Sequence, residues 1–299
     1  MNLRDMECFI EVCKYNSINY TAEQLYLSPQ GLSNIIKRLE NELGVKLFNR
    51  TQSGLRITDY GEVFLAKSKK MLEDYQNVLT EIESLKIQKN GLVKLSSAFG
   101  VLRYLKPEFI TNFHICFPDL NLDYIELPDL FVEEYIETSK ADIGITPSPN
   151  SDLFDEIPLF STPISFITHD KSRFYDRQSV SLKEIVEEPL ILESENFRIN
   201  KIIMSKFKNI DVVPNIFFLT SGFSLCYKVC NQNLANTVTT DFIFNDMRYP
   251  NMRMIPFEED LHWDVSMILR KNMVLTDTIE AFIEYTKNTC REQGLSMNN

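Results

Sequence analysis

The side chains near the N-terminus that could do chemistry are suited to contacting bases and phosphates. Gln30, Ser33, Asn34 and Lys37 recur at helical spacing within residues 28–38, which would bring them to one face of a helix. Amide side chains can pair bidentately with adenine, a serine hydroxyl with several bases, and lysine with guanine or a phosphate. The solvated face of an ordinary three-helix bundle has the same composition, so this face alone leaves both interpretations open.

The helix that would present these side chains is predicted to begin at Ser28-Pro29 and to end at Gly44. Serine is a good N-cap, proline suits the first helical position, and glycine commonly ends a helix. A tight turn before it and an apolar inner face complete the pattern of a helix-turn-helix. The inner face consists of Leu32, Ile35, Ile36, Leu39 and Leu43.

Two shorter helices should precede this one. The first has an apolar face of Leu3, Met6, Phe9, Ile10 and Cys13, a spacing typical of an amphipathic helix. Asn16-Ser17 should break it, and Asn19 can then cap a second helix over Tyr20–Tyr26.

Residues 45–58 are predicted to form two short strands around a polar turn, with Gly54 near its tip. Arg50 and Arg56 bracket this turn, as they would in the wing of a winged helix-turn-helix beside a DNA backbone. The residues expected to contact DNA are therefore Ser28, Pro29, Gln30, Ser33, Asn34, Lys37, Arg38, Arg50, Ser53 and Arg56.

Residues 1–70 resemble the DNA-binding domain of LysR-type transcriptional regulators. The positions that carry the resemblance are Phe9, Val12, Ser17, Ala22, Leu25, Ser28, Leu32, Ser33, Ile36, Leu39, Glu40, Glu42, Leu43, Gly44, Leu47, Phe48, Arg50, Gly54, Thr58 and Gly61. Two departures stand out. Thr21 replaces the first of two alanines that are usual in the family, and Asn34 stands where an arginine is frequent. The second departure means that the base preference of relatives does not transfer to this chain.

A long helix should follow over residues 59–90, which contain no proline and no glycine apart from Gly61. Its apolar residues alternate at spacings of four and three, in a heptad stripe of Phe64, Met71, Tyr75, Val78, Ile82 and Leu85. Packing on its own domain would also use such a stripe. A narrow seam bordered by charged residues favours pairing with a second copy. The resemblance implies the same dimerising helix, and a homotetramer built from two dimers.

From Gly91 onward, predicted strands and helices alternate, which favours a mainly parallel, doubly wound α/β fold. A helical stretch is expected through Phe113. Residues 158–163, bounded by two prolines, should separate two lobes, and the alternation restarts with a strand at Ile164 and a helix near Leu182–Val186. Lobe I would comprise about residues 91–162 and 266–299, and lobe II about residues 163–265.

The LysR-type resemblance extends loosely into this region, through Asp142–Ile145, Ser181-Leu182, Glu188–Ile191 and Trp263. It implies a two-lobed effector domain like the periplasmic binding proteins. The expected fold is thus multi-domain. It comprises a winged helix-turn-helix over residues 1–58, a linker helix and hinge over 59–90, and an effector-binding domain over 91–299. Asn231–Asn233 replaces a glycine-containing turn of the family, and asparagine tolerates the same positive φ.

Ligands of such sheets bind outside the carboxyl ends of the strands, against helix N-termini. The polar turns at these ends predict an effector site formed by Ser97, Phe99, Gly100, Thr146, Ser194, Asn196, Arg198, Thr220, Ser221 and Thr239. Arg198 is the candidate for holding a carboxylate or phosphate, although it could equally balance Glu193 and Glu195. Phe99, Phe197 and Phe223 fit either the site or the core, and an acidic cleft would instead suit a cationic ligand.

The net charge of −11 does not argue against DNA binding, because it is unevenly distributed. Residues 1–90 contain 12 Lys+Arg and 12 Asp+Glu, whereas residues 91–299 contain 19 and 30. Phosphate contact requires only a local basic face. No apolar run is long enough to span a bilayer, and the N-terminus lacks the features of a signal peptide, so a cytoplasmic protein is expected.

Other classes of protein have weaker support in the sequence. The three histidines and six cysteines form no metal-site spacing, so no metal and no cofactor is expected. Cys226 and Cys230, four residues apart, leave a thiol-based redox sensor on the same scaffold as an alternative. An enzyme with a fused DNA-binding head lacks support, because no catalytic motif is present. The expected partners are double-stranded DNA with an inverted repeat, a small-molecule effector and a second copy of the chain. The same function allows contact with RNA polymerase.

Overall fold

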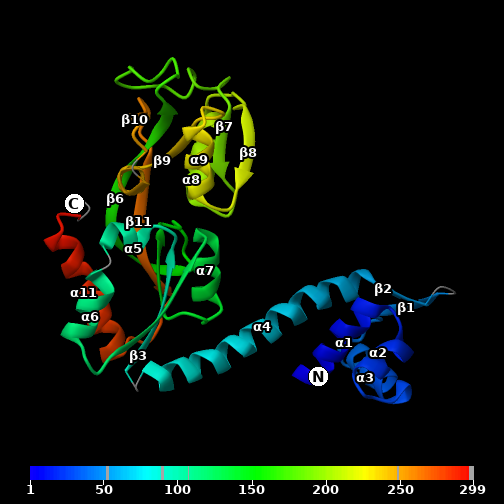
Figure 1. The fold of residues 1–299 in the computed structure, drawn as a ribbon. Helices are drawn as coiled ribbons and strands as arrows, with labels where there is room; N and C mark the ends of the chain where they lie inside the picture. Colours follow the sequence, from blue (N-terminus) through cyan, green and yellow to red (C-terminus); the bar gives the residue numbers. More distant parts are fainter. Residues whose placement is uncertain (52–53, 89–90, 107, 248, 296–299) are drawn as a thin grey trace. The chain divides into compact units, whose positions relative to one another are not determined.

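The computed structural model describes residues 1–51, 54–88, 91–106, 108–247 and 249–295. The chain forms two compact units, Met1–Ile82 and Glu83–Asn299 (Figure 1). Each unit has its own buried core. No helix within the described ranges is long and apolar enough to cross a membrane.

The N-terminal unit begins with three helices, α1 (Leu3–Tyr15), α2 (Ile18–Gln24) and α3 (Pro29–Leu43). The predicted ends of α3 are confirmed. The Ser28 hydroxyl accepts the Gly31 N–H at 3.1 Å, and Gly44 ends the helix at φ +70°, where glycine has no Cβ penalty.

The prediction for α2 was wrong by two residues at its start. Ser17, not Asn19, caps the helix, because its hydroxyl accepts the Tyr20 N–H. Both residue types are good N-caps, and tertiary packing selects the earlier one by burying Thr21 and Ala22.

The wing is confirmed as an antiparallel pair of strands, β1 (Phe48–Thr51) and β2 (Gly54–Ile57). Leu43, predicted to face the core, is 39% exposed. Glu40 is buried instead, and its carboxylate accepts the Leu47 N–H at 3.0 Å and binds the Lys46 ammonium at 2.6 Å. A buried carboxylate is tolerated here because backbone and side-chain donors satisfy it, and these contacts hold the segment leading into the wing.

The last helix to begin in the N-terminal unit, α4, spans Asp59–Gln88 without interruption, as the absence of proline predicted. Gly61 lies near its start because a Cβ there would come within 2.4 Å of the Leu47 carbonyl oxygen. The close approach brings the first turn of α4 against the start of the wing.

The C-terminal unit is built on a seven-stranded mixed sheet in the order β10-β6-β11-β5-β3-β4, with β9 also paired to β6. Its strands are β3 (Leu92–Ala98), β4 (Asn121–Leu127), β5 (Ile143–Pro147), β6 (Phe154–His169), β9 (Thr237–Thr240), β10 (Met252–Pro256) and β11 (His262–Arg270). A separate parallel pair consists of β7 (Leu190–Glu193) and β8 (Ile216–Thr220). An isolated bridge between Leu190 and Asn236 brings this pair beside β9.

Helices divide this unit into two lobes. In the first lobe, α7 lies on one face of the sheet and α6 and α11 lie on the other (Figure 1). Its helices are α5 (Val101–Leu105), α6 (Glu108–Cys116), α7 (Asp129–Glu137) and α11 (Asp277–Glu292). The second lobe contains β7 to β10 and the helices α8 (Arg198–Asn209), α9 (Phe223–Asn231) and α10 (Asp241–Met247). The two long strands β6 and β11 connect the lobes.

Three predictions for this unit need correction. The sheet is mixed, because β3, β4 and β5 are parallel whereas β6, β9, β10 and β11 pair antiparallel. Leu182–Val186 forms turns, not a helix. The helical stretch expected through Phe113 is two helices, α5 and α6, with Lys106 between them at φ +68°.

Residues 158–163 are not a junction between strands, since β6 runs through them as one strand of 16 residues. Pro158 lies opposite Ser266, where the pairing of β6 with β11 shifts register at a bulge. Pro163 lies near the end of the pairing, opposite His262. Proline is tolerated in a sheet at such positions because no ladder hydrogen bond depends on its missing N–H.

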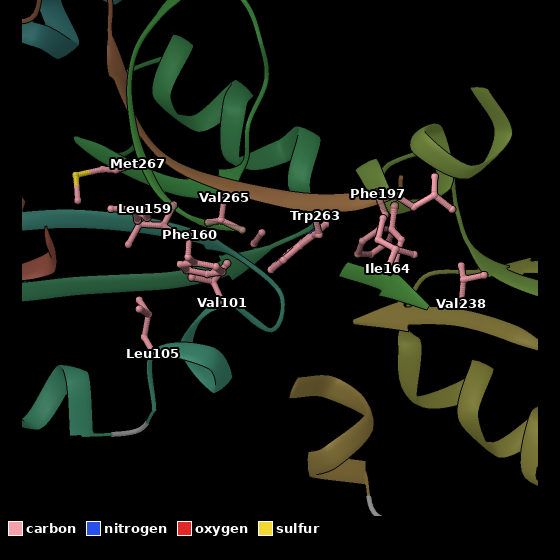
Figure 2. Packing of buried hydrophobic residues seen from close by; sticks show 14 of the residues in the cluster. Val101, Leu105, Leu159, Phe160, Ile164, Phe197, Val238, Trp263, Val265 and Met267 are labelled. Carbon is pink, nitrogen blue, oxygen red and sulfur yellow. The ribbon is translucent and has the colours of Figure 1, made fainter. Parts of the chain in front are cut away.

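One hydrophobic core extends through both lobes of the C-terminal unit. Figure 2 shows Trp263 between Phe160 on one side and Ile164 and Phe197 on the other. The Trp263 ring lies 6.4 Å from the Phe160 ring, centroid to centroid. The core is therefore continuous along the connecting strands, and packed hydrophobic side chains fill the space where the two lobes meet.

Candidate DNA-binding face and effector cavity

The face of α3 predicted to read bases is exposed. Gln30, Asn34 and Lys37 are exposed, and Ser33 is partly so. The Gln30 amide donates to the Asn34 side-chain oxygen at 3.2 Å. This contact fixes two amides one helical turn apart, and each retains donors and acceptors for a base edge.

Arg38 occupies a different position from the other predicted DNA contacts. Its guanidinium forms an ion pair with Asp5 of α1, which is 1% exposed. Asp5 also completes a capping box with Asn2. Arg38 thus connects α3 to α1 and neutralises a buried carboxylate, which costs less than leaving that charge unpaired.

The wing presents Arg56, which is exposed and paired through its backbone with Asn49. The Arg50 backbone pairs with Leu55, while its side chain and the whole of Ser53 lie outside the described residues. Ser28 and Pro29 are exposed at the start of α3, where the positive end of the helix dipole favours an anion.

The apolar stripe of α4 divides into two parts. Phe64 packs into the N-terminal core, with its ring 4.9 Å from the Phe9 ring. Further along the helix, the stripe remains exposed by 43 to 53% at Met71, Tyr75, Val78 and Ile82. Leu85 is partly buried. Four large apolar side chains at spacings of four and three, half exposed in one protomer, form the seam that a paired helix would cover.

Between the lobes of the C-terminal unit lies a small cavity of about 20 Å³. Its lining consists of Phe99, Asp129, Glu193, Phe197, Ile199, Phe223, Thr240, Ile243 and Trp263. The volume is that of about one water-sized group, so the lobes are closed around it.

Two acidic side chains in this lining lie close enough to interact. Burial raises the pKa of Asp129 to about 7, against the opposing effect of the Arg198 backbone N–H and guanidinium. Burial and the neighbouring Asp129 charge raise the pKa of Glu193 to about 8, and the Phe223 backbone N–H opposes this. Both carboxyls therefore ionise far less readily than exposed ones.

Contacts between α7 and the start of α8 close one side of the cavity. The Asp129 carboxylate accepts the Arg198 N–H at 2.8 Å. The Leu130 N–H donates to the Asn196 carbonyl oxygen at 3.3 Å. The Arg198 guanidinium forms an ion pair with Glu133. Because Arg198 is in the second lobe and Asp129 and Glu133 are in the first, these contacts hold the lobes together.

The Arg198 guanidinium, the candidate for holding a carboxylate or phosphate, forms an ion pair with Glu133 through one terminal nitrogen, while its Nε is buried without a hydrogen-bond partner among the described residues. Its role toward an effector stays a prediction. The ion-pair partner is Glu133, and not Glu193 or Glu195, the balancing partners considered from the sequence. Sequence proximity suggested those two, whereas the partner comes from another lobe 65 residues away.

Among the ten predicted effector residues, only Phe99 lines the cavity. The Ser97 hydroxyl bonds the Tyr124 hydroxyl at 2.9 Å. Thr146 and Thr239 are buried in their strands. Gly100, at φ +91°, lets Phe242 and Ile243 approach within about 3.4 Å of a Cβ position. Ser194, Asn196 and Thr220 are partly buried, and Ser221 is exposed.

Sequence reasoning missed Asp129, Glu193, Thr240 and Trp263 as cavity residues. Glu193 and Thr240 are the last residues of β7 and β9, and Asp129 follows the end of β4 by two residues. The rule that ligands bind at carboxyl ends of strands therefore pointed to the turns that line the cavity. The register within each turn decides which side chain faces the cavity, and this register could not be predicted from the sequence.

Comparison with known proteins decides the family. Residues 87–291 match the LysR substrate binding domain, and residues 3–62 match the bacterial regulatory helix-turn-helix protein, lysR family. The chain belongs to the LysR family of bacterial transcriptional regulators. It is a DNA-binding transcriptional regulator with an effector-binding domain.

Relatives and solved structures of the LysR family match nearly the whole chain. The uncharacterized regulator YwbI of Bacillus subtilis is 25% identical, with 96% of each chain covered. A full-length OxyR variant from Pseudomonas aeruginosa has a TM-score of 0.58 at 21% identity, covering 97% of this chain and 100% of that one. Full-length CbnR in complex with its target DNA has a TM-score of 0.54 at 15% identity, covering 97% and 100%. At these identities the structures share the fold.

LysR-family regulators bind DNA and effector molecules and form oligomers. The exposed face of α3, the stripe of α4 and the interlobe cavity are the candidate sites for these three interactions. Within the described part of the chain, no group of three or more His, Cys, Asp or Glu side chains could hold a metal ion. The thiols of Cys226 and Cys230 are buried in α9, and burial raises the pKa of each to about 12.

Proposed function

We propose that this regulator binds an inverted-repeat DNA site as a homodimer, with α3 of each copy in a major groove and the wing against the backbone. The observation that carries the proposal is the exposed Gln30, Asn34 and Lys37 face of α3. Ser28, Pro29, Gln30, Ser33, Asn34, Lys37, Arg50, Ser53 and Arg56 are the proposed contacts. Arg38 has the role of positioning α3, since Asp5 holds its guanidinium.

The domains implied by this function are the DNA-binding head over residues 1–58, the dimerising helix over 59–90 and the effector domain over 91–299. We propose that the effector binds in the interlobe cavity and changes lobe closure, which alters how the two heads meet DNA. Pairing of dimers into a tetramer and contact with RNA polymerase belong to the same proposal. A regulator of this kind acts in the cytoplasm, where bacterial DNA lies, and needs no catalytic residue or cofactor.

Replacing Asn34 by alanine tests the face of α3. A bidentate amide–adenine contact contributes about 1–3 kcal/mol of discrimination, so N34A should lower the affinity for the specific site by about 10-fold or more while leaving random DNA nearly unaffected. Fluorescence anisotropy with DNA from upstream of the regulator's own gene measures both affinities.

Two further variants give this test its controls. Lys37→Ala should weaken specific and random DNA alike and reduce the salt slope by about 1, because a phosphate contact carries no sequence information. Gln24→Ala removes an exposed amide from the neighbouring α2 and should change neither affinity. Equal losses on both DNAs for N34A would contradict base reading by α3.

The thiol-switch alternative gains no support from the described geometry, so we propose a regulator that does not sense oxidants through these cysteines. The thiolate is the reactive form of cysteine, and buried thiols with a pKa of about 12 are protonated at neutral pH. Cys116, in contrast, is exposed on α6.

Thiol alkylation should therefore discriminate between these positions. Iodoacetamide at neutral pH is expected to modify Cys116 in the native protein and to leave Cys226 and Cys230 unmodified, as peptide mass spectrometry would show. The double variant Cys226→Ser, Cys230→Ser should keep wild-type DNA affinity with and without hydrogen peroxide. A peroxide response that disappears in this double variant would restore the redox interpretation.

A further inference from the structure

The interlobe cavity has a composition that restricts what it can bind. Its polar lining comes from Asp129, Glu193 and Thr240, all of which offer oxygen atoms. The rest of the lining is apolar and mostly aromatic: Phe99, Phe197, Phe223 and Trp263, with Ile199 and Ile243. No lysine, arginine or histidine is among these residues.

The two carboxyl groups have too little positive charge around them. Arg198 is the nearby cation, but its guanidinium is paired with Glu133. Among the described residues, no cationic side chain forms an ion pair with Glu193. Asp129, Glu133 and Glu193 together face one arginine here, with Lys201 interacting only with Glu133. Glu156 adds a fourth carboxyl beside Glu133, so the group carries net negative charge once these carboxyls are ionised, and a cation in the cavity would compensate part of that charge.

Thr240 gives a second, independent indication of a missing partner. Its side chain is 1% exposed, it lines the cavity, and its hydroxyl oxygen is buried without a hydrogen-bond partner. Buried hydroxyls are nearly always satisfied, because leaving one unpaired costs free energy. A donor placed in the cavity would satisfy it.

The aromatic rings suit the same kind of ligand. Phe99 and Phe197 stack with ring centroids 6.4 Å apart, and Trp263 and Phe223 complete the lining. Ring faces carry a negative potential that attracts cations. An anion would meet two carboxyls and these rings, and would find no positively charged partner in the lining.

The hydrogen-bonding groups of the cavity restrict the class of cationic ligand further. A primary ammonium group has three donors and no acceptor, and the cavity offers the oxygens of Asp129, Glu193 and Thr240. A quaternary ammonium has no N–H to give them. About 20 Å³ accommodates a group the size of an –NH₃⁺ head, and a longer stem would require the lobes to separate.

We propose that the effector is a small organic cation whose primary ammonium group binds Asp129, Glu193 and Thr240 between the lobes. This inference rests on the proposed role of the cavity as the effector site. Because Asp129 and Glu193 come from different lobes, the ammonium would bridge them. Binding at this point therefore sets lobe closure.

Propylammonium chloride is a suitable probe, with sodium butyrate as the carboxylate of similar size and propyltrimethylammonium as the cation without N–H donors. Trp263 is the only tryptophan of the chain and lines the cavity, so its fluorescence reports binding directly. At saturating concentrations, propylammonium is expected to change the Trp263 emission of the full-length protein saturably and to raise its Tm by ~3 °C. Butyrate and propyltrimethylammonium at equal ionic strength should do neither.

Two variants locate the effect. Glu193→Gln keeps the shape of the side chain but removes its charge, and should weaken propylammonium binding by about 10-fold or more. Glu195→Gln neutralises an exposed carboxylate in the same turn and should leave binding unchanged. Equal binding by wild type and E193Q, or no saturable change with propylammonium, would overturn the inference.

The outcomes also separate this inference from the proposed function. Saturable binding of butyrate that is lost on Thr240→Val would indicate that the cavity binds an anion. That result would overturn the inference of a cationic effector and would leave the cavity as the proposed effector site. Propylammonium binding that depends on Glu193 supports the cation site. If propylammonium bound at this site but left the affinity of the protein for promoter DNA unchanged, the proposed effector role of the cavity would be contradicted, and the cation site would still be supported.

Discussion

Replacing Val78 by glutamate is expected to convert the proposed homodimer to monomers at micromolar concentration and to lower the affinity for a two-half-site DNA by at least about 100-fold. Val78 is 53% exposed at the centre of the stripe formed by Met71, Tyr75, Val78 and Ile82. In a paired helix, the substitution would place two carboxylates in one apolar seam. Burying unpaired charges costs far more than the seam gains from one valine contact.

The loss in DNA affinity follows from linkage between the two heads. Each head contacts one half-site, and joining them makes the second contact intramolecular, which raises overall affinity by about 10² to 10⁴. A monomeric V78E protein should therefore bind a single half-site as the wild type does, while losing the gain on the full site. Analytical ultracentrifugation and anisotropy on half-site and full-site DNA measure the two effects separately.

Gln76→Glu is the matched control, because it adds the same charge to an exposed residue of α4 outside the stripe. It should leave both the dimer and the DNA affinity intact. A V78E protein that remained dimeric with wild-type affinity would show that the copies associate elsewhere, and the stripe would then need another explanation.

Features that depend on local chemistry were predictable from the sequence. Ser28 and Gly44 set the ends of α3 through a side-chain cap and a left-handed backbone conformation, both of which act within a few residues. Asn233 adopts φ +57° after α9. This agrees with the prediction that an asparagine can take the positive φ of the glycine-containing turn that it replaces. The same applies to α4, whose length follows from a long run without proline.

Features that depend on distant partners were not predictable. The spacing of Leu182, Ile185 and Val186 indicated a helix, but the Leu182 N–H donates to Glu259 at 3.0 Å and the segment forms turns. A new strand was expected to begin at Ile164, yet β6 runs through Pro158 and Pro163, and the bulge at Pro158 forms in its pairing with β11, about 100 residues later in the sequence. In each case a tertiary contact outweighs the local preference.

The cavity shows the same limit at the scale of a single residue. Thr239 and Thr240 are adjacent at the end of β9, and successive side chains of a strand point to opposite faces. Their pairing with Ser165 and Ile164 of β6 fixes which one lines the cavity. The sequence therefore located the turn but selected Thr239, whereas Thr240 is the residue in the lining.

The unliganded effector domain is expected to lose stability as the pH rises from about 4 to about 8, contrary to the usual behaviour of carboxylates. In the unfolded chain Asp129 and Glu193 ionise near their ordinary pKa values of 3.8 and 4.5, whereas in the fold they keep their protons until about pH 7 and 8. Between these values the unfolded state binds fewer protons, so rising pH favours unfolding. The stabilisation is complete below the unfolded pKa and is lost as pH rises through the folded one.

The size of the effect is limited by the surroundings of the pair. Each carboxyl changes stability by up to about 1.4 kcal/mol per pH unit within its window. Asp129 faces Arg198, which lowers its pKa, and Glu133, which raises it. Glu193 faces Asp129. Urea unfolding followed through Trp263, from about pH 5 to about pH 8.5, measures the slope in this domain because the chain has no other tryptophan.

Glu193→Gln provides the decisive comparison, since the amide cannot ionise and has nearly the same volume. The variant should be more stable than the wild type at about pH 8, where the wild-type carboxyl must either hold its proton or bury a charge, and its pH slope should be shallower. Glu195→Gln, on the exposed side of the same turn, should follow the wild-type curve. Parallel slopes for wild type and E193Q would mean that Glu193 is solvated in the unliganded protein. A carboxyl that is costly to ionise when the cavity is empty is one whose charge an entering cation would stabilise, so ligand and pH act on the same two groups.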